Sequence, residues 1–429
     1  MNTNFINPSP ELWPDLIKRP AIDSKNLDAA VLEIINTVRH SGDQAVKNYS
    51  MQFQGFSPEN LWVSKDEIKN ASKAIDKVLK KAILLAKNNI EKFHQQQYQK
   101  IKKITTTDGV VCWRKSVPIE NVGLYIPGGS APLFSTLLML GIPAAIAGCK
   151  NIIVTTPPQN NGQINTVVLY VASLLGINKI YKSGGAQAIA ALAYGTETVE
   201  KVDKIFGPGN QYVTCAKKFV NADGVAIDML AGPSELAVYA DDSSVPEFVA
   251  ADILSQAEHG ADSHVVLVAA NSNIIENVIK AIHAQLPLLA RNKIIEQSFL
   301  NRKFIVIEKK EEAFRLINEY APEHLIIASK NAYSLSRYVK NAGSVFLGNL
   351  SPESAGDYAS GTNHSLPTNG TAKVHAGVSV DSFVKKITFQ KINKKGIRNI
   401  GSAVERMAEA EGLDAHKNAV SIRLKKINK

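Results

Sequence analysis

The segment KIYKSGGAQAIAALAY, residues 179–194, contains the pattern that decides the fold of this chain. A short β-rich run (179–182) meets the glycine pair Gly184 and Gly185, and a helical stretch (186–194) follows at once. A strand that turns through glycines into a helix is the repeating unit of parallel sheets with helices on their faces. The segment therefore predicts an α/β fold.

The same alternation extends from residue 122 to residue 347. Further strands are predicted at 122–126, 152–156, 204–206, 236–240, 264–269, 304–307, 325–328 and 344–347. Helices are predicted between them at 134–146, 166–175, 211–220, 246–258, 274–284 and 311–320. Ligands of open α/β sheets bind beyond the carboxyl ends of strands, so the glycine turns at 127–129, 183–185 and 207–210 are candidate binding loops. None has the GxGxxG spacing of a dinucleotide fingerprint, and a purely structural role for these turns stays open.

The two ends of the chain have a different pattern. Ser64 and Glu67 form a capping box, and apolar residues at three- and four-residue steps predict one long amphipathic helix over 68–93. The tail beyond about residue 380 is basic and contains one helical stretch, 403–410.

Composition bounds the class of protein. With 429 residues, 45% hydrophobic and 21% charged, the chain is expected to form two or three globular domains. Its three scattered cysteines exclude a disulfide framework and a CxxC zinc knuckle. The opening residues lack the pattern of a secretory signal. The most apolar stretch, 137–148, is shorter than the roughly 20 residues of a membrane span. We therefore expect a cytoplasmic protein with no membrane partner.

The charge balance is basic, with 49 Lys and Arg against 39 Asp and Glu. The excess lies partly in 65–103 and partly in 385–429, where acidic and apolar residues interrupt it at helical spacing. We interpret these clusters as solvated helix faces and expect no nucleic-acid partner. Alternatively, the positive electrostatic field of these clusters could attract a cofactor that carries phosphate groups.

Two short motifs carry side chains suited to catalysis. Gln256 and His259 lie three residues apart near a predicted helix end and share one face, where they could bind a metal. The alternative is a histidine that only complements the helix dipole. Glu323 and His324 are adjacent at a corner between a helix and a strand, where a carboxylate and an imidazole could abstract protons. The alternative is a helix-end glutamate beside a half-buried histidine.

Three other features complete the candidates. A polar loop, 348–367, contains Asp357 and His364, and its length suggests shaping around a ligand. The acidic turn 409–416 ends in His416. It could bind a metal or an amine, or it could simply be the end of a helix. Cys149 precedes an apolar strand and is interpreted as a packed thiol, not a nucleophile.

Seven segments together resemble the histidinol dehydrogenase family. They are YIPGGSAPLFSTLLMLGIPAAIAGC (125–149), SGGAQAIAALAYGTETVEKVDKIFGPGNQYV (183–213), DMLAGPSE (228–235), SQAEHG (255–260), EYAPEHL (319–325), PESAGDYASGTNHSLPT (352–368) and EAEGLDAH (409–416). The resemblance runs from about residue 30 to 424 in the family's order. The main local departure is KVHAGV (373–378), where the family often shows Arg and Ser-Gly-Leu, and it affects no catalytic position.

The resemblance implies NAD-dependent oxidation of L-histidinol through L-histidinal to L-histidine, the last step of histidine biosynthesis, with two NAD reduced. It implies zinc ligands that also contact the substrate: Gln256, His259, Asp357 and His416. It implies Glu323 and His324 as acid/base residues, His324 also contacting the substrate. Ser234 and Glu411 are implied as further substrate positions. Tyr125, Gln187 and Asn210 are implied as NAD-binding residues.

The resemblance also implies an architecture of two incomplete Rossmann-like parallel-sheet domains with small terminal segments. The expected divisions are an N-terminal segment (1–22), a discontinuous first domain (23–124 with 237–378), an NAD-binding second domain (125–236) and a C-terminal tail (379–429). The tail would be swapped in a homodimer, so that Glu411 and His416 complete the partner's site. A zinc-dependent hydrolase, or a dehydrogenase of another imidazole alcohol, is the alternative function.

Overall fold

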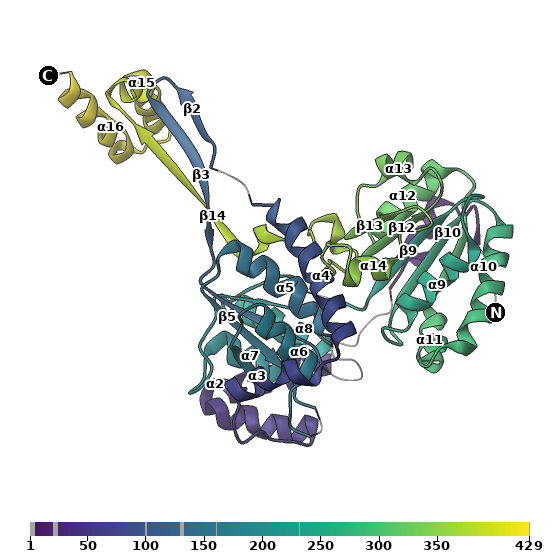
Figure 1. Ribbon diagram of the computed structural model, residues 1–429. Helices are drawn as coiled ribbons and strands as arrows, with labels where there is room; N and C mark the ends of the chain where they lie inside the picture. Colours follow the sequence, from purple (N-terminus) through teal and green to yellow (C-terminus); the bar gives the residue numbers. More distant parts are fainter. Residues whose placement is uncertain are drawn as a thin grey trace.

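The computed structural model describes residues 5–19, 25–98, 101–128, 133–159, 161–230 and 232–428 (Figure 1). It contains two parallel sheets and one antiparallel sheet in these ranges. The expected α/β fold with two parallel-sheet domains is confirmed.

The first parallel sheet has the order β6-β5-β4-β7-β8. Its strands are β4 (Asn121–Tyr125), β5 (Asn151–Thr156), β6 (Lys179–Lys182), β7 (Lys204–Phe206) and β8 (Ala226–Ile227). The helices between the strands are α5 (Phe134–Ala147), α6 (Thr166–Leu174), α7 (Gly185–Tyr194) and α8 (Gln211–Ala222). All of these except the short β8 match predicted elements to within two residues, because each is a continuous apolar run ended by a turn.

Three N-terminal helices pack on this sheet domain. They are α2 (Lys25–Gln54), α3 (Lys65–Ala74) and α4 (Lys77–Gln95). Helix α2 contacts α7 and α8, α3 contacts α6, and α4 contacts α5. The expected grouping of 23–124 with 237–378 stays a prediction. Parallel sheets are covered on both faces, and these helices supply part of that cover.

The single helix predicted over 68–93 is two helices, α3 and α4. The side chain of Asp76 accepts hydrogen bonds from the backbone N–H groups of Val78 (2.8 Å) and Leu79 (2.9 Å). This N-cap starts α4 and breaks the continuous pattern. The predicted capping box of Ser64 and Glu67 is confirmed at the start of α3.

The second parallel sheet has the order β1-β11-β10-β9-β12-β13. Its strands are β1 (Phe5–Ile6), β9 (Glu235–Ala240), β10 (His264–Ala269), β11 (Lys303–Val306), β12 (His324–Ala328) and β13 (Ser344–Leu347). Its helices are α9 (Pro246–Ala257), α10 (Ser272–Gln285), α11 (Asn292–Ser298), α12 (Lys310–Tyr320) and α13 (Ala332–Leu335). The N-terminal segment joins this domain through β1 and through α1 (Trp13–Leu16), whose Trp13 is buried in its core.

The predicted polar loop over 348–367 contains a short helix, α14 (Glu353–Tyr358). The helix lies so close to β13 that a Cβ on Gly356 would be 2.6 Å from the ring of Phe346. The sequence did not predict this helix because its residues are small and polar and form no apolar stripe. The helix packs on β13 because Gly356 has no side chain.

A separate arm projects away from both parallel-sheet domains (Figure 1). It consists of the antiparallel strands β14 (Val384–Ile392), β3 (Val110–Pro118) and β2 (Lys103–Thr107), with helices α15 (Lys394–Ala410) and α16 (Asp414–Ile427). At its root the ring of Phe383 stacks on that of Phe206 at 4.0 Å, and both are fully buried. Within the described ranges we find no helix that is both long and apolar enough to span a bilayer.

Candidate active site

The candidate site lies where the carboxyl edge of the first sheet meets the amino edge of the second. Tyr125 ends β4, whereas Glu235 and His324 begin β9 and β12. A small cavity of 60 Å³ joins the two edges, with Asp228 on one side and Glu323 on the other. The rule that ligands bind at the carboxyl ends of strands therefore predicts the part of the site on the first sheet, but not the part on the second sheet.

A cavity of about 790 Å³ lies at the carboxyl edge of the first sheet. The three predicted NAD positions, Tyr125, Gln187 and Asn210, all line it, and α2 adds Tyr49 and Phe53. Its volume, and its lining of aromatic and polar side chains, are typical of cofactor sites. The structure thus brings the three predicted positions together in one cavity.

Local structure explains the placement of these three residues. The Tyr125 hydroxyl accepts a hydrogen bond from the backbone N–H of Gly185 (3.1 Å) at the start of α7. The Asn210 side chain caps α8. Gln187 is only 1% exposed, and both atoms of its amide lack a hydrogen-bond partner in the described part of the chain. A buried amide without partners is costly, so it marks a place for a polar ligand beside the N-terminus of α7.

The backbone of Glu235 positions the Glu323–His324 corner. Glu323 Oε2 accepts a hydrogen bond from the Glu235 N–H at 3.0 Å, and His324 Nδ1 lies 3.2 Å from the Glu235 carbonyl oxygen. The carboxylate of Glu235 is itself bound by Arg19 Nε (2.5 Å) and by the backbone N–H of Asn369 (2.7 Å). Sequence reasoning missed Arg19 and Glu235, because their roles depend on the pairing of β9 with β12.

The predicted metal ligands within one chain come from two helices. Gln256 lies in the last turn of α9, His259 lies two residues after that helix ends, and Asp357 lies on α14. Gln256 is completely buried, and both its amide atoms lack a hydrogen-bond partner among the described residues. A bound cation would satisfy the orphaned amide oxygen, so the residues present fit a metal.

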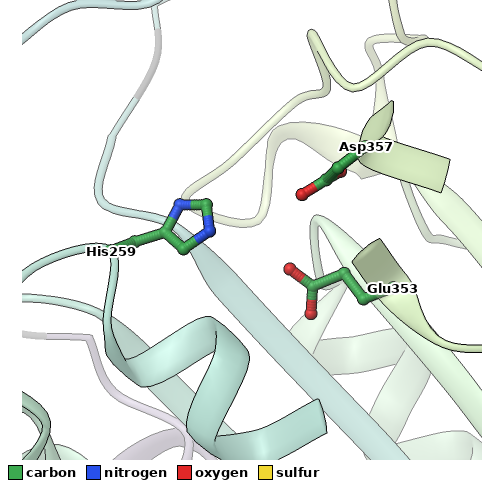
Figure 2. A group of neighbouring side chains, drawn as sticks. All are labelled: His259, Glu353 and Asp357. Atoms are coloured by element: carbon green, nitrogen blue, oxygen red, sulfur yellow. The ribbon is translucent and has the colours of Figure 1, made fainter. Parts of the chain in front are cut away.

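Figure 2 shows His259, Glu353 and Asp357 directed toward a common space. Their ligand atoms all lie within 4.8 Å of one another. His259 is exposed, so this space is open on one side. Glu353 is the member that sequence reasoning missed. Its signal was its position one helical turn before Asp357, which puts both carboxylates on one face once α14 is recognised.

The electrostatics of the site are strongly acidic. Burial raises the pKa of Glu323 to about 7. Burial alone would lower the pKa of His324, but the nearby carboxylates of Glu353, Glu323 and Asp357 outweigh it and raise that pKa. Burial also works against ionisation of Asp357, yet the hydrogen bond and charge of His324 hold its pKa low. Such a cluster suits a divalent cation and an amine-bearing substrate.

The other predicted residues are placed as follows. Ser234 lines the 60 Å³ cavity together with Glu323. His364 contacts the Asp357 carbonyl oxygen (Nδ1, 2.9 Å) and Thr136 Oγ1 (Nε2, 3.2 Å), so it links α14 to α5.

Two expected positions and the thiol lie elsewhere. Glu411 and His416 are exposed on the arm, and one chain alone does not bring them to the site (Figure 1). Burial raises the pKa of the Cys149 thiol to about 11, which supports the interpretation of a packed cysteine.

Comparison with known proteins gives one consistent result. A family model described as histidinol dehydrogenase matches residues 17–424. The histidinol dehydrogenase of Bacteroides thetaiotaomicron is 55% identical over 417 residues, 97% of each chain. That of Campylobacter jejuni is 49% identical over 416 residues, 96% of each chain. The crystal structure of histidinol dehydrogenase from Elizabethkingia anophelis superposes with a TM-score of 0.97 at 54% identity, covering 99% of this chain and 98% of that one.

Proposed function

The chain belongs to the histidinol dehydrogenase family, enzymes that are oxidoreductases of histidine biosynthesis, and on this premise we propose that it oxidises L-histidinol through L-histidinal to L-histidine with zinc and NAD. The observation that carries the proposal is the orphaned, fully buried amide of Gln256, one turn before His259, whose ring is grouped with Asp357, while Asp357 lies 3.5 Å from His324. A site of this kind suits a metal-bound polar substrate, and we expect it to work in the cytoplasm.

Gln256, His259 and Asp357 would hold the zinc, and Tyr125, Gln187 and Asn210 would bind NAD. Nitrogen and oxygen donors of this kind are normal zinc ligands. When bound, zinc would hold the imidazole and amine of the substrate in place, and NAD would accept the hydrides. The large cavity lined by the orphaned amide of Gln187 supports the assignment of the NAD residues.

His324 and Glu323 would carry the protons. His324 takes the hydroxyl proton while the hydride on the same carbon leaves for NAD, which yields the aldehyde. Glu323 then removes a proton from water as the water oxygen adds to the aldehyde carbon, and His324 returns its proton to the former carbonyl oxygen, which gives the diol and regenerates the neutral imidazole. His324 deprotonates the resulting diol as the second hydride leaves, which yields the carboxylic acid. The raised pKa of Glu323, caused by burial, makes its carboxylate a stronger base than an exposed one.

We propose further that the active form is a homodimer. Glu411 and His416 lie on an exposed arm, and His259 is open on one side of the site. An arm that reaches into a second subunit would supply the fourth zinc ligand and a substrate contact there.

One spectrophotometric assay tests the proposed function. Enzyme, L-histidinol and NAD are followed at 340 nm with and without EDTA. We expect two NADH per histidinol consumed, and loss of this activity on chelation. A metal-dependent hydrolase would produce no NADH, and a dehydrogenase of another imidazole alcohol would have a higher kcat/KM for an analogue that lacks the amine. Either result would overturn the proposal.

A further inference from the structure

Lys217 and Asp228 form a buried ion pair that the proposed reaction does not use. Lys217 is 1% exposed, the Asp228 side chain is 3% exposed, and the lysine Nζ contacts Asp228 Oδ1. Removing two charges from water is costly, and their attraction alone often fails to compensate for that cost. The other hydrogen bonds of the two side chains therefore indicate what the pair does.

Both side chains bind the backbone of Gly207, the first residue of the 207–210 loop, which connects β7 to α8. Lys217 Nζ donates a hydrogen bond to the Gly207 carbonyl oxygen (2.9 Å), and Asp228 Oδ2 accepts one from the Gly207 N–H (2.8 Å). Asp228 Oδ1 also accepts from the backbone N–H of Met229 (2.7 Å), so both carboxylate oxygens are engaged. Hydrogen bonds to charged groups are stronger than those between neutral groups, so Gly207 is held firmly at both its N–H and its carbonyl.

The first parallel sheet brings these residues together. β7 and β8 are parallel neighbours, so Gly207 and Asp228, which directly follow them, leave the sheet at the same edge. Lys217 lies about two turns after Asn210, the residue that caps α8, and its side chain points back toward the start of that helix. A Cβ on Gly207, whose φ is 125°, would be 2.1 Å from the carbonyl oxygen of Tyr125, so the loop begins in direct contact with the end of β4.

The 207–210 loop lies between the large cavity and the Glu323–His324 corner. Asn210, at the end of the loop, lines the cavity of about 790 Å³. Gly207 and Pro208, at its start, line the 60 Å³ cavity together with Glu323. Hydride transfer requires the nicotinamide carbon to approach the substrate carbon closely. In the proposed reaction the nicotinamide end of NAD therefore lies along this loop, and the adenosine end lies farther away, toward the wall formed by α2.

We propose that Lys217 and Asp228 are positioning residues that hold the 207–210 loop in the shape that receives the nicotinamide end of NAD. The inference rests on the proposed function, which places NAD in the large cavity and hydride transfer at the corner. The pair acts through the backbone of Gly207 and takes no part in proton or hydride transfer. A loop that is fixed before the cofactor arrives loses less conformational freedom on binding, so its shape contributes to affinity as well as to rate.

The test removes both charges at once in Lys217→Met/Asp228→Asn, so that no unpaired charge is left buried. Binding of NADH is measured by its fluorescence, and binding of ADP-ribose, which lacks the nicotinamide, by calorimetry. We expect the Kd of NADH to rise about fivefold or more and that of ADP-ribose to change less than about twofold. The kcat with histidinol should fall about 10- to 100-fold, because a displaced nicotinamide presents its carbon poorly to the substrate.

A matched control is the ion pair of Lys179 and Glu200 (2.5 Å), since Lys179 begins β6 at the amino edge of the same sheet. Lys179→Met/Glu200→Gln removes two charges without changing the loop, and it should bind both ligands like the wild type. Hydrogen exchange of the ligand-free proteins, followed by mass spectrometry, gives a second comparison. The segment that contains Gly207 should exchange faster in Lys217→Met/Asp228→Asn than in the control, because the Gly207 N–H loses its charged acceptor.

A second variant and a measurement on the wild type keep the inference testable if the double variant does not fold. Asp228→Glu keeps both charges but adds a methylene, which moves the carboxylate relative to Gly207. We expect it to raise the Kd of NADH about two- to fivefold and to leave that of ADP-ribose unchanged. In the wild type, NADH should slow hydrogen exchange of the 207–210 loop more than ADP-ribose does.

Three results would overturn the inference. Unchanged NADH affinity and kcat would show that the pair does not shape the loop. Equal losses of NADH and ADP-ribose affinity would give the pair a general role in the fold of the domain. Equal protection of the loop by the two ligands would place the nicotinamide elsewhere. If the wild type binds NADH but forms none from histidinol, the proposed function fails, and the binding and exchange comparisons alone then decide whether the pair positions the cofactor.

Discussion

The position of His416 allows a quantitative test of the shared site. His259 belongs to the second sheet domain, whereas His416 lies on α16 of the projecting arm (Figure 1). If the arm completes the partner's site, each site takes His259 from one chain and His416 from the other. His259→Ala and His416→Ala homodimers should then both be inactive, because every site in them lacks one ligand.

Mixing the two variants should restore activity by a calculable amount. In a mixed dimer, one site carries both substitutions and the other carries neither. Random exchange of equal amounts makes about half of the dimers mixed, so about one quarter of all sites are intact in a two-fold symmetric assembly. We therefore expect about 25% of wild-type turnover, followed as NADH formation at 340 nm after mixing.

A matched control separates this explanation from nonspecific recovery. His259 and Asp357 lie together within one chain. Mixing His259→Ala with Asp357→Ala places both substitutions in the same half of the site. In a mixed dimer each site then has one substitution, and no activity should return. Exchange is verified by native mass spectrometry of chains with different tags. Confirmed exchange without recovery in the first mixture would refute the shared site.

Three further predictions concern stability and the thiol. Phe383→Ala removes a fully buried ring stacked on Phe206 and should lower the free energy of unfolding in urea by about 3–5 kcal/mol. Phe389→Ala removes a partly exposed ring farther out on the arm and should lower it less. Equal losses would contradict the idea that the Phe383–Phe206 pair anchors the arm. Burial lowers the pKa of His264 to about 4 in the folded protein, whereas the unfolded chain has the ordinary value of about 6.5. As the pH falls from 6.5 toward 4, the unfolded chain takes up a proton that the folded protein does not, so the free energy of unfolding decreases. The free energy of unfolding should drop by about 2 kcal/mol between pH 7.5 and pH 5 from this group, and His264→Gln should show a drop smaller by that amount; an identical pH dependence would count against it. Cys149→Ala should keep near-normal turnover, and a folded but inactive variant would assign the thiol a catalytic role.

Local patterns predicted most of the parallel-sheet elements. The strands 179–182, 204–206, 264–269 and 344–347 agree with β6, β7, β10 and β13 to the residue. Each is a short apolar run with turn residues at its ends, and such runs depend little on distant parts of the chain. The antiparallel arm was missed because its strands are exposed and rich in Lys and Thr without a strict alternation, and its partners β3 and β14 are over 260 residues apart.

The candidate site was predicted in part. Glu323 with His324, and Gln256 with His259, are short local motifs whose chemistry can be read from adjacent residues. Glu353 was not found, because a carboxylate in a polar segment is unremarkable until α14 packs on Phe346. Its significance comes from burial and from the 3.7 Å approach to His324.

The amino-acid sequence by itself determined the α/β class, most strand and helix positions, and the residue types available for metal and proton chemistry. These properties follow from side-chain periodicity and turn chemistry, which act over a few residues. Only the tertiary structure decided that α2, α3 and α4 cover the first sheet and that Glu235 and Arg19 support the Glu323–His324 corner. It also decided that α14 brings the carboxylates of Glu353 and Asp357 close to the imidazole of His324. These contacts join segments up to 216 residues apart, and the free energy of burying apolar surface and pairing buried charges selects them only when the whole chain is packed.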